Sequence, residues 1–267
     1  ILDVALSKIG DKGLFTKALE DKLLDGSIDL AVHSLKDLPT VLPQGLGIAA
    51  ITEREDPRDV FISKNGVILK DLPDNAKIAT GSLRRQSQLL NFRGDLQIQD
   101  LRGNVPTRIS KLQSNPWDGI ILARAGLKRL ELLHEATEVI DEQIMLPAVG
   151  QGALGIETRE RDFQMQAILA PLNHADSAAG TKAERALLRK LEGGCQVPIG
   201  AFGRVIDGEL HLKAYVGSLT GHQAVRGNIS GSPDNADSLG VQLANQLLRE
   251  GADQILRGVR DSIEAHE

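Results

Sequence analysis

Residues 77–86 read Lys77-Ile78-Ala79-Thr80-Gly81-Ser82-Leu83-Arg84-Arg85-Gln86, and this stretch predicts the architecture of the first half of the chain. The apolar run that ends at Thr80 is typical of a short buried strand, and Ser82 is a typical N-cap for a helix that continues to Leu90. A strand followed directly by a helix is the repeating unit of α/β proteins with parallel strands. The helix start also offers free N–H groups and a positive dipole end to an anion.

The same alternation extends on both sides of this stretch. Further strands are predicted at 29–32, 45–51, 58–62, 96–101 and 119–123, and further helices at 14–25, 106–112 and 127–133. We therefore expect parallel sheets flanked by helices up to about residue 150. Residues 146–157 are rich in glycine and apolar side chains, which favours either a crossover between domains or a lid.

The last third of the chain has a different pattern. A helix is predicted at 182–191, three strands at 199–206, 210–216 and 223–229, and two helices at 237–249 and 252–265. The dipeptide Asp207-Gly208 between the first two strands is typical of a tight hairpin. This pattern predicts a small α+β domain with a three-stranded antiparallel sheet and helices on one face.

Basic residues follow three successive predicted strands. They are Arg84, Arg85, Arg102, Arg108 and Arg129. Because parallel strands end at one edge of a sheet, this arrangement indicates a cleft for several carboxylates or phosphates. For Arg84 and Arg85 the alternative is a solvated pair on a helix surface, but arginine is disfavoured at a helix N-terminus unless an anion compensates.

A second group of polar residues lies near the start of the chain. Lys36 and Asp37 follow a predicted strand and precede Pro39. A carboxylate beside cations can stay ionised and can accept or relay a proton, although an ordinary surface ion pair is the simpler interpretation of these two residues alone. Further basic or aromatic candidates in this region are Lys8, Lys12 and Phe15.

The single cysteine, Cys195, lies in Gly193-Gly194-Cys195-Gln196-Val197-Pro198. The glycines and the proline indicate a loop. A lone cysteine is most often a small buried hydrophobe, but the freedom of this loop favours a thiol that attacks or carries another group. A hydrolase with a cysteine nucleophile would need a histidine base, and no obvious motif supplies one.

Composition and charge exclude several classes of protein. A net charge of −5 and an aromatic content of 3% argue against a nucleic-acid-binding protein. No apolar run approaches the length of a membrane span, and one cysteine fits a reducing compartment, so we expect a cytoplasmic protein. No histidine and cysteine residues have the spacing of a metal site. The chain begins Ile1-Leu2-Asp3 without methionine, and we expect some N-terminal sequence to be missing.

Taken together, these motifs resemble the porphobilinogen deaminase, or hydroxymethylbilane synthase, family. The matching segments follow the family's order: 8–15, 31–39, 53–59, 80–86, 101–108, 125–130, 146–157 and 191–198. The resemblance implies two α/β domains joined by a hinge, like periplasmic binding proteins, and a small C-terminal α+β domain. The domains would comprise 1–52 with 152–172, then 53–151, then 173–267, and the family's N-terminal strand and helix would be missing from the first.

The resemblance also implies a function. Members of the family are transferases of haem biosynthesis that join four porphobilinogen molecules head to tail, with loss of ammonia, to give the linear tetrapyrrole hydroxymethylbilane. The resemblance places a covalent dipyrromethane cofactor on Cys195 through a thioether and the catalytic role on Asp37, and it suggests a monomer. Cofactor contacts would come from Lys36, Asp37, Thr80, Ser82, Arg84 and Arg85, and substrate contacts from Arg102, Arg108, Arg129, Lys8, Lys12 and Phe15.

The competing interpretation is a two-lobed, non-enzymatic binding protein for a small polycarboxylate or another anion. Such a protein would need the arginines but neither Cys195 nor Asp37. In the family, each pyrrole of the growing chain carries an acetate and a propionate, so a cluster of arginines has a purpose there. One departure from the family is Gly81, where many relatives carry a small hydroxyl residue.

Overall fold

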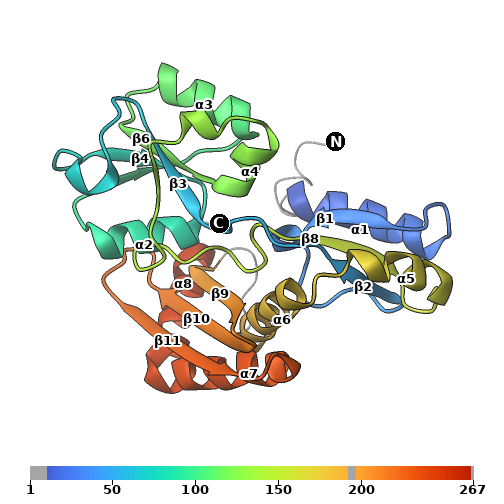
Figure 1. Cartoon of the computed structure of the whole chain (residues 1–267). Coiled ribbons are helices and arrows are strands. Elements are labelled where there is room, and N and C mark those ends of the chain that lie inside the picture. Colours follow the sequence, from blue (N-terminus) through green and yellow to red (C-terminus); the bar gives the residue numbers. More distant parts are fainter. Residues whose placement is uncertain (1–10, 192–196, 266–267) are drawn as a thin grey trace.

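The computed structural model describes residues 11–191 and 197–265, without the side chains of residues 11–15. In these ranges the chain forms three sheets with helices packed against them (Figure 1). The N-terminal and central sheets lie side by side, and the C-terminal sheet lies beneath the central one in this view. The predicted combination of α/β parts with a small α+β part is confirmed.

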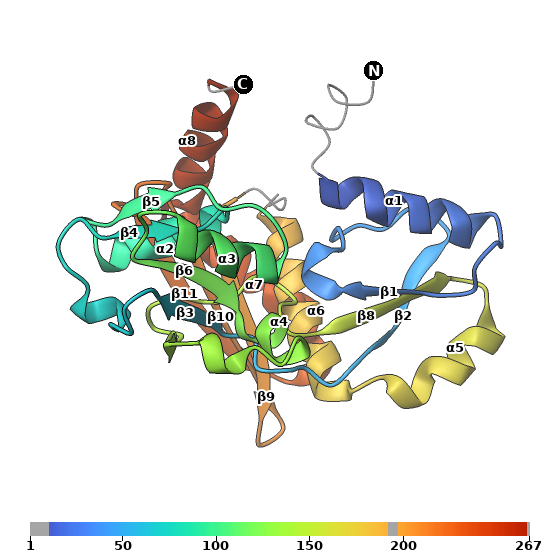
Figure 2. The same cartoon turned by 90° about the horizontal axis from the view of Figure 1, so that it is seen from above.

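The N-terminal sheet has its middle strand from a distant part of the sequence. Its order is β1 (Ala31–Ser34), β8 (Leu154–Arg159) and β2 (Leu46–Ile51). Because β8 is antiparallel to both neighbours, the prediction of a parallel sheet is wrong here. Helices α1 (Asp11–Leu24) and α5 (Phe163–Leu169) cover opposite faces of this sheet (Figure 2). Leu23 and Leu46 are buried on the α1 side, and Ile156 and Leu169 on the α5 side.

The central sheet is mixed. Its strands are, in order, β5 (Gln97–Gln99), β4 (Lys77–Ala79), β6 (Gly119–Ala123), β3 (Asp59–Ser63) and β7 (Glu138–Val139). Strands β5, β4 and β6 are parallel, as predicted, whereas β3 is antiparallel to β6 and β7. The helices that follow the three parallel strands are α2 (Leu83–Phe92) after β4, α3 (Val105–Ser114) after β5 and α4 (Arg124–Arg129) after β6. Apolar clusters fill both faces of the sheet.

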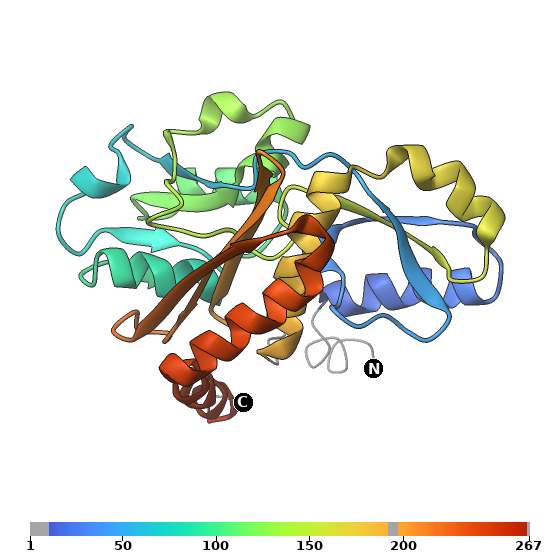
Figure 3. The same ribbon diagram turned by 60° about the horizontal axis from the view of Figure 1, so that its bottom comes forward.

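The C-terminal part is the predicted antiparallel meander. Its strands are β9 (Ile199–Ile206), β10 (Glu209–Gly217) and β11 (Ala224–Gly231), and its helices are α6 (Ala175–Lys190), α7 (Ala236–Leu247) and α8 (Asp253–Glu264). Asp207 and Gly208 both have positive φ, 51° and 79°, as a type I′ hairpin requires. Figure 3 shows α7 lying along the sheet, and α6 and α7 share one apolar cluster with it.

Short turns of other helix types connect these elements. They are the 3-10 turns η1 (Leu35–Asp37), η2 (Leu69–Asp71), η3 (Leu133–Glu135), η4 (Ala170–Leu172) and η5 (Pro233–Asn235), and the π turn η6 (Leu248–Ala252) before α8. In the described ranges, no helix combines the length and the apolar character needed to cross a membrane.

Two chain segments join the N-terminal sheet to the central sheet. Residues 52–58 leave β2, residues 140–153 return to β8, and the two segments run side by side. Glu55 N donates a hydrogen bond to Gly152 O at 3.0 Å, and a Cβ on Gly152, whose φ is +89°, would lie 2.4 Å from Glu55 O. Residues 146–153 thus pass from the central sheet to the N-terminal sheet, as a crossover would, and residues 154–157 form part of the middle strand of the N-terminal sheet.

The closest approach of α6 to β9 provides a test of the packing. A Cβ on Gly180 would lie 2.4 Å from Gly203 O, so alanine there forces the helix away from the strand. We expect Gly180→Ala to lower the free energy of unfolding by about 1–3 kcal/mol in urea denaturation. Gly258→Ala is the matched control, because Gly258 lies in α8 and no atom of the described residues lies within 4 Å of a Cβ there, and it should stabilise by about 0.5–1 kcal/mol. Equal effects of the two substitutions would contradict this packing.

Candidate functional site

The carboxyl ends of β5, β4 and β6 lie next to one another because these strands are parallel neighbours. At the end of β4, Ser82 is the N-cap of α2, and its Oγ accepts a hydrogen bond from Arg85 N at 3.4 Å. Thr80 Oγ1 accepts a hydrogen bond from Ser82 N at 3.2 Å. At the start of α3, Asn104 Oδ1 caps the helix in the same way. The predicted series of helix starts at one sheet edge is confirmed.

Arg84 and Arg85 are buried, with 5% and 6% of their surface exposed, so they are not a solvated pair. Both contact Asp59, the first residue of β3: Arg84 Nη1 lies 2.8 Å from Oδ2 and Arg85 Nη2 lies 2.8 Å from Oδ1. Each guanidinium also donates to a main-chain carbonyl, Arg84 to Leu146 O and Arg85 to Ile121 O. The structure thus supplies a buried counter-ion that the sequence did not reveal.

The two guanidinium groups determine the charge state of Asp59. Burial alone would raise the pKa of Asp59, but Arg84 and Arg85 hold the pKa of this carboxyl well below its usual range. Asp59 is therefore ionised, and the three side chains together carry one net positive charge. Arg85 Nε is buried and has no hydrogen-bond partner among the described residues.

The remaining predicted arginines are more accessible. Arg108 is half-buried and donates from Nε to Gly103 O at 2.6 Å; burial, with a contribution from Arg85, lowers its pKa. Arg102 is exposed, and its Nε lies 3.4 Å from Asp100 Oδ2. Arg129 is exposed in the last turn of α4, at the far end of that helix from β6. Arg124 begins α4 and pairs with Glu55, an interaction that the sequence did not predict.

Lys36 and Asp37 lie on a 3-10 turn, η1 (Leu35–Asp37), that directly follows β1. Both side chains are half-buried. Lys36 Nζ donates to Gln151 Oε1 at 3.3 Å, and Gln151 Nε2 donates to Asp59 Oδ1 at 2.9 Å. The structure therefore links the Lys36–Asp37 turn of the N-terminal sheet to the arginine cluster of the central sheet. Gln151, which makes this link, was not singled out from the sequence.

A second buried ion pair ties the crossover to the C-terminal part. Arg54 donates from Nη1 and Nη2 to the two carboxylate oxygens of Glu184 in α6. Glu184 also accepts hydrogen bonds of 2.7 Å from the main-chain N–H groups of Gly150 and Gly203. Arg54 Nε donates to Gln151 O at 2.8 Å. All three parts of the chain are thus hydrogen-bonded to one another beside the candidate site.

A separate cluster of titratable groups lies between α1 and the N-terminal sheet. His33 Nε2 and Glu157 Oε2 are 3.0 Å apart, and both side chains are buried. Burial, with the charge of Glu157, raises the pKa of Glu20 on α1. Glu157 Oε1 is buried and has no hydrogen-bond partner within the described ranges.

Four predicted site residues cannot be placed. Lys8 and Cys195 lie outside the described residues. The main chain of Lys12 and Phe15 belongs to α1, but their side chains also lie outside the description. Across residues 11–191 and 197–265, no three histidine, cysteine, aspartate or glutamate side chains are grouped as a metal site would require.

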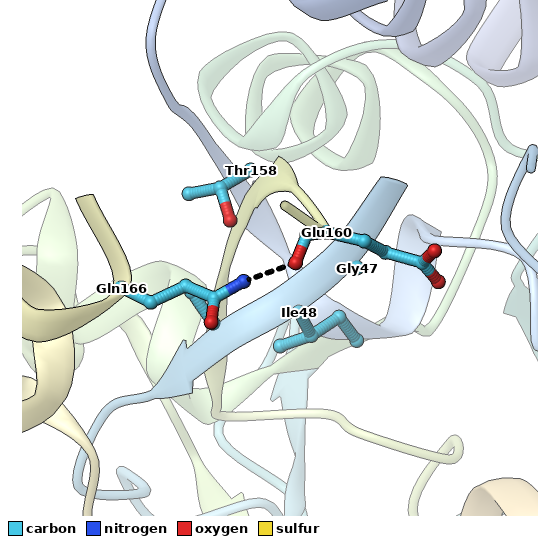
Figure 4. Close-up of a pocket in the computed structure, with 6 residues that line it drawn as sticks. Gly47, Ile48, Thr158, Glu160 and Gln166 are labelled. Carbon is cyan, nitrogen blue, oxygen red and sulfur yellow. Dashed lines mark hydrogen bonds between the residues drawn. The ribbon is translucent and has the colours of Figure 1, made fainter. Parts of the chain in front are cut away.

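A small open hollow lies elsewhere, on the N-terminal sheet beside α5 (Figure 4). Its volume is ≈ 210 Å³, and Gln166 Nε2 donates to Glu160 O at 2.9 Å within it. It is lined by Gly47, Ile48, Ala49, Thr158, Glu160 and Gln166. Because none of the described residues that line this hollow is cationic, it does not suit a polyanion, and the arginine cluster remains the candidate site.

Comparisons with known proteins point in one direction. The family model described as "Porphobilinogen deaminase, dipyromethane cofactor binding domain" matches residues 1–167, and "Porphobilinogen deaminase, C-terminal domain" matches residues 178–249. The chain is 54% identical over 263 residues to the porphobilinogen deaminase of Chlorobaculum parvum, covering 97% of this chain and 84% of that protein. It is 52% identical over 260 residues to that of Carboxydothermus hydrogenoformans, with the same coverage.

Similarity to solved structures is much weaker. A YaeC-family lipoprotein of Enterococcus faecalis matches with a TM-score of 0.38 and 16% identity, over 58% of this chain and 74% of that one. A TRAP periplasmic solute-binding protein of Desulfovibrio salexigens also has a TM-score of 0.38, with 11% identity, over 59% of this chain and 57% of that one. Scores below 0.5 do not establish a shared overall fold.

Proposed function

This chain belongs to the porphobilinogen deaminase family, whose members are transferases, and from that premise we propose that it joins four porphobilinogen molecules head to tail, with loss of ammonia, to give hydroxymethylbilane. The observation that supports this most strongly is the buried Arg84–Arg85 pair, linked through Asp59 and Gln151 to the turn that carries Asp37. Together with Asp59, the pair keeps one net positive charge, which favours a carboxylate at this edge of the sheet.

The donors at this sheet edge fit a dipyrromethane that carries acetate and propionate groups. The first part of the chain is the cofactor-binding domain of the family. Hydroxyl, ammonium and guanidinium groups are the side chains that bind carboxylates well, and the fixed N–H groups at the start of α2 add to them. When bound, the group supplies the pyrrole to which the first substrate is joined. We propose that it is held by Thr80, Ser82, Arg84, Arg85, Lys36 and Asp37, with Cys195 as the thioether anchor.

Asp37 is proposed as the catalytic residue. Loss of ammonia from porphobilinogen leaves a positive charge on the substrate pyrrole, and a carboxylate near the pyrrole N–H stabilises that charge and can accept a proton. Asp37 is half-buried at the end of β1, beside Lys36, so its carboxylate is partly shielded from water. Substrate carboxylates are assigned to the cations outside the buried cluster, Arg102, Arg108, Arg129, Lys8 and Lys12, and Phe15 is assigned as a ring near the substrate pyrroles.

Intact mass spectrometry tests the anchor directly. We expect protein purified from cells that make porphobilinogen to exceed its sequence mass by two pyrrole units, because the thioether at Cys195 survives denaturation. The Cys195→Ala variant should have its unmodified mass. An unmodified Cys195 in protein that consumes porphobilinogen would overturn the assignment of this residue.

The competing function, a non-enzymatic anion-binding protein, predicts binding of porphobilinogen without its consumption. The family membership favours the transferase. The proposal includes a monomer in the cytoplasm that is divided into three domains: 1–52 with 152–172, then 53–151, then 173–267.

A further inference from the structure

We propose that Gln151 is a positioning residue that couples Lys36, beside Asp37, to the Asp59–Arg84–Arg85 cluster across the crossover. The inference rests on the proposed function, because it concerns how the two sides of that site are held together. Lys36 lies on the turn that follows β1 of the N-terminal sheet, and Asp59 belongs to β3 of the central sheet, whereas Gln151 lies on the chain segment between the two sheets.

Both polar atoms of the Gln151 side chain are hydrogen-bonded. Nε2 donates to Pro57 O at 2.7 Å and to Asp59 Oδ1 at 2.9 Å, and Oε1 accepts from Lys36 Nζ at 3.3 Å. The residue is only 1% exposed, so water cannot replace these partners readily. An amide turned by 180° would set its oxygen against the Asp59 carboxylate and its NH₂ against the Lys36 ammonium. The charges on either side therefore fix the orientation of the amide.

The main chain of Gln151 is held as firmly as its side chain. Its N–H donates to Ala148 O at 2.9 Å, and its carbonyl accepts from Arg54 Nε at 2.8 Å. Arg54 is in turn paired with the buried Glu184. Gln151 is thus a rigid bridge, and it sets the distance between the cations on the two sides of the site.

This bridge also shares an acceptor with the arginines. Asp59 Oδ1 accepts from both Arg85 Nη2 and Gln151 Nε2. A ligand carboxylate that binds Arg85 would compete with the Asp59 carboxylate for the same guanidinium group. A shift of the Asp59 carboxylate would then move Lys36 as well, because the side-chain amide of Gln151 is hydrogen-bonded to both residues. Gln151 consequently aligns the ammonium and guanidinium groups for the carboxylates of one ligand.

The test is a double-mutant cycle with Gln151→Met and Lys36→Met, measured as kcat/KM for porphobilinogen. Methionine keeps the length and volume of glutamine but forms none of the three hydrogen bonds. We expect Gln151→Met to lower kcat/KM by about 10–100-fold, the scale of a positioning defect. If Gln151 acts through Lys36, the double variant loses little more than the larger single loss. Fully additive losses would overturn the proposal.

A second readout needs neither turnover nor the cofactor. The rate at which acetic anhydride acetylates Lys36, followed by mass spectrometry, reports whether the ammonium is held. We expect this rate to rise several-fold in Gln151→Met and to stay unchanged in Gln166→Met. Gln166 is a suitable control because its amide also bonds to a carbonyl, Glu160 O, but it lies on α5 away from the site. An unchanged Lys36 rate in Gln151→Met would also overturn the proposal.

Two controls keep the result interpretable. If Gln151→Met fails to fold, Gln151→Asn keeps the amide but is one methylene too short to bond to Lys36 and Asp59 together, and it should show the same faster acetylation. If wild-type protein does not consume porphobilinogen, the proposed function fails, whereas the acetylation rates still decide whether Gln151 holds Lys36.

Discussion

Replacing Asp37 with asparagine is expected to lower kcat by about 10²–10⁴-fold, the range that one acid–base group contributes. Asparagine has nearly the same shape but can neither accept a proton nor balance the charge left on the substrate when ammonia departs. The turn itself is held by the buried Leu35, which is 1% exposed, and by a hydrogen bond from Leu38 N to Leu35 O. The fold and the bound dipyrromethane should therefore persist.

The chain contains a matched control for this substitution. Leu69-Lys70-Asp71 is the same tripeptide as Leu35-Lys36-Asp37, and it also forms a 3-10 turn with its leucine buried. Asp71→Asn should leave kcat unchanged. The measurements are porphobilinogen consumption, intact mass and circular dichroism for both variants. Turnover near the wild-type rate in Asp37→Asn would remove this residue from the mechanism.

Asp59→Asn is expected to lower the free energy of unfolding by about 3–5 kcal/mol, because it leaves two buried guanidinium groups without their counter-ion. Urea denaturation at pH 7 measures the loss. Asp253→Asn is the control: Asp253 pairs with Arg257 on the surface of α8, and its removal should change stability by no more than about 0.5 kcal/mol. A small effect at Asp59 would show that the arginines have other compensating partners.

The difference in unfolding free energy between the wild type and Asp59→Asn should depend on pH in a defined way. The pKa of Asp59 is lower in the folded protein than in the unfolded chain, so its contribution to stability is complete above the unfolded value of about 3.9 and is lost as the pH falls below it. The difference in stability between wild type and Asp59→Asn should therefore be constant from pH 7 to about pH 5 and shrink below about pH 4. A difference that grows with acidification would contradict the assignment.

The fold was predictable where structure follows from local pattern. Strand β9 has the bounds that were predicted, because a run of apolar residues ends at a hairpin whose two residues adopt positive φ. Strand β8 was not predicted as a strand. It contains Gly155 and the buried Glu157, and its two partner strands come from the first 51 residues. Its conformation depends on contacts with distant residues, which local periodicity does not report.

In the candidate site, too, the features set by local sequence were predictable and those set by distant contacts were not. The helix start at Ser82 and the arginines after it were predicted, because an N-cap and a strand end are local features. Asp59 and Gln151 were not, because their roles arise only when three segments meet. One signal was present in the sequence: Asp59 lies in the predicted strand 58–62, directly before the apolar Val60, Phe61 and Ile62, and a carboxylate that is buried beside such residues needs a cation.

The position of β8 in the N-terminal sheet has a consequence for synthesis of the chain. Strands β1 and β2 end by Ile51, whereas β8 begins at Leu154, after every strand of the central sheet. All strands of the central sheet, from β3 to β7, lie in one continuous stretch of the sequence, so this sheet can form as it leaves the ribosome. Until β8 emerges, β1 and β2 have no partner between them and present open edges to other chains. In the interval when β7 has left the ribosome and β8 has not, the nascent chain would hold a folded central part and an N-terminal sheet that had not yet formed.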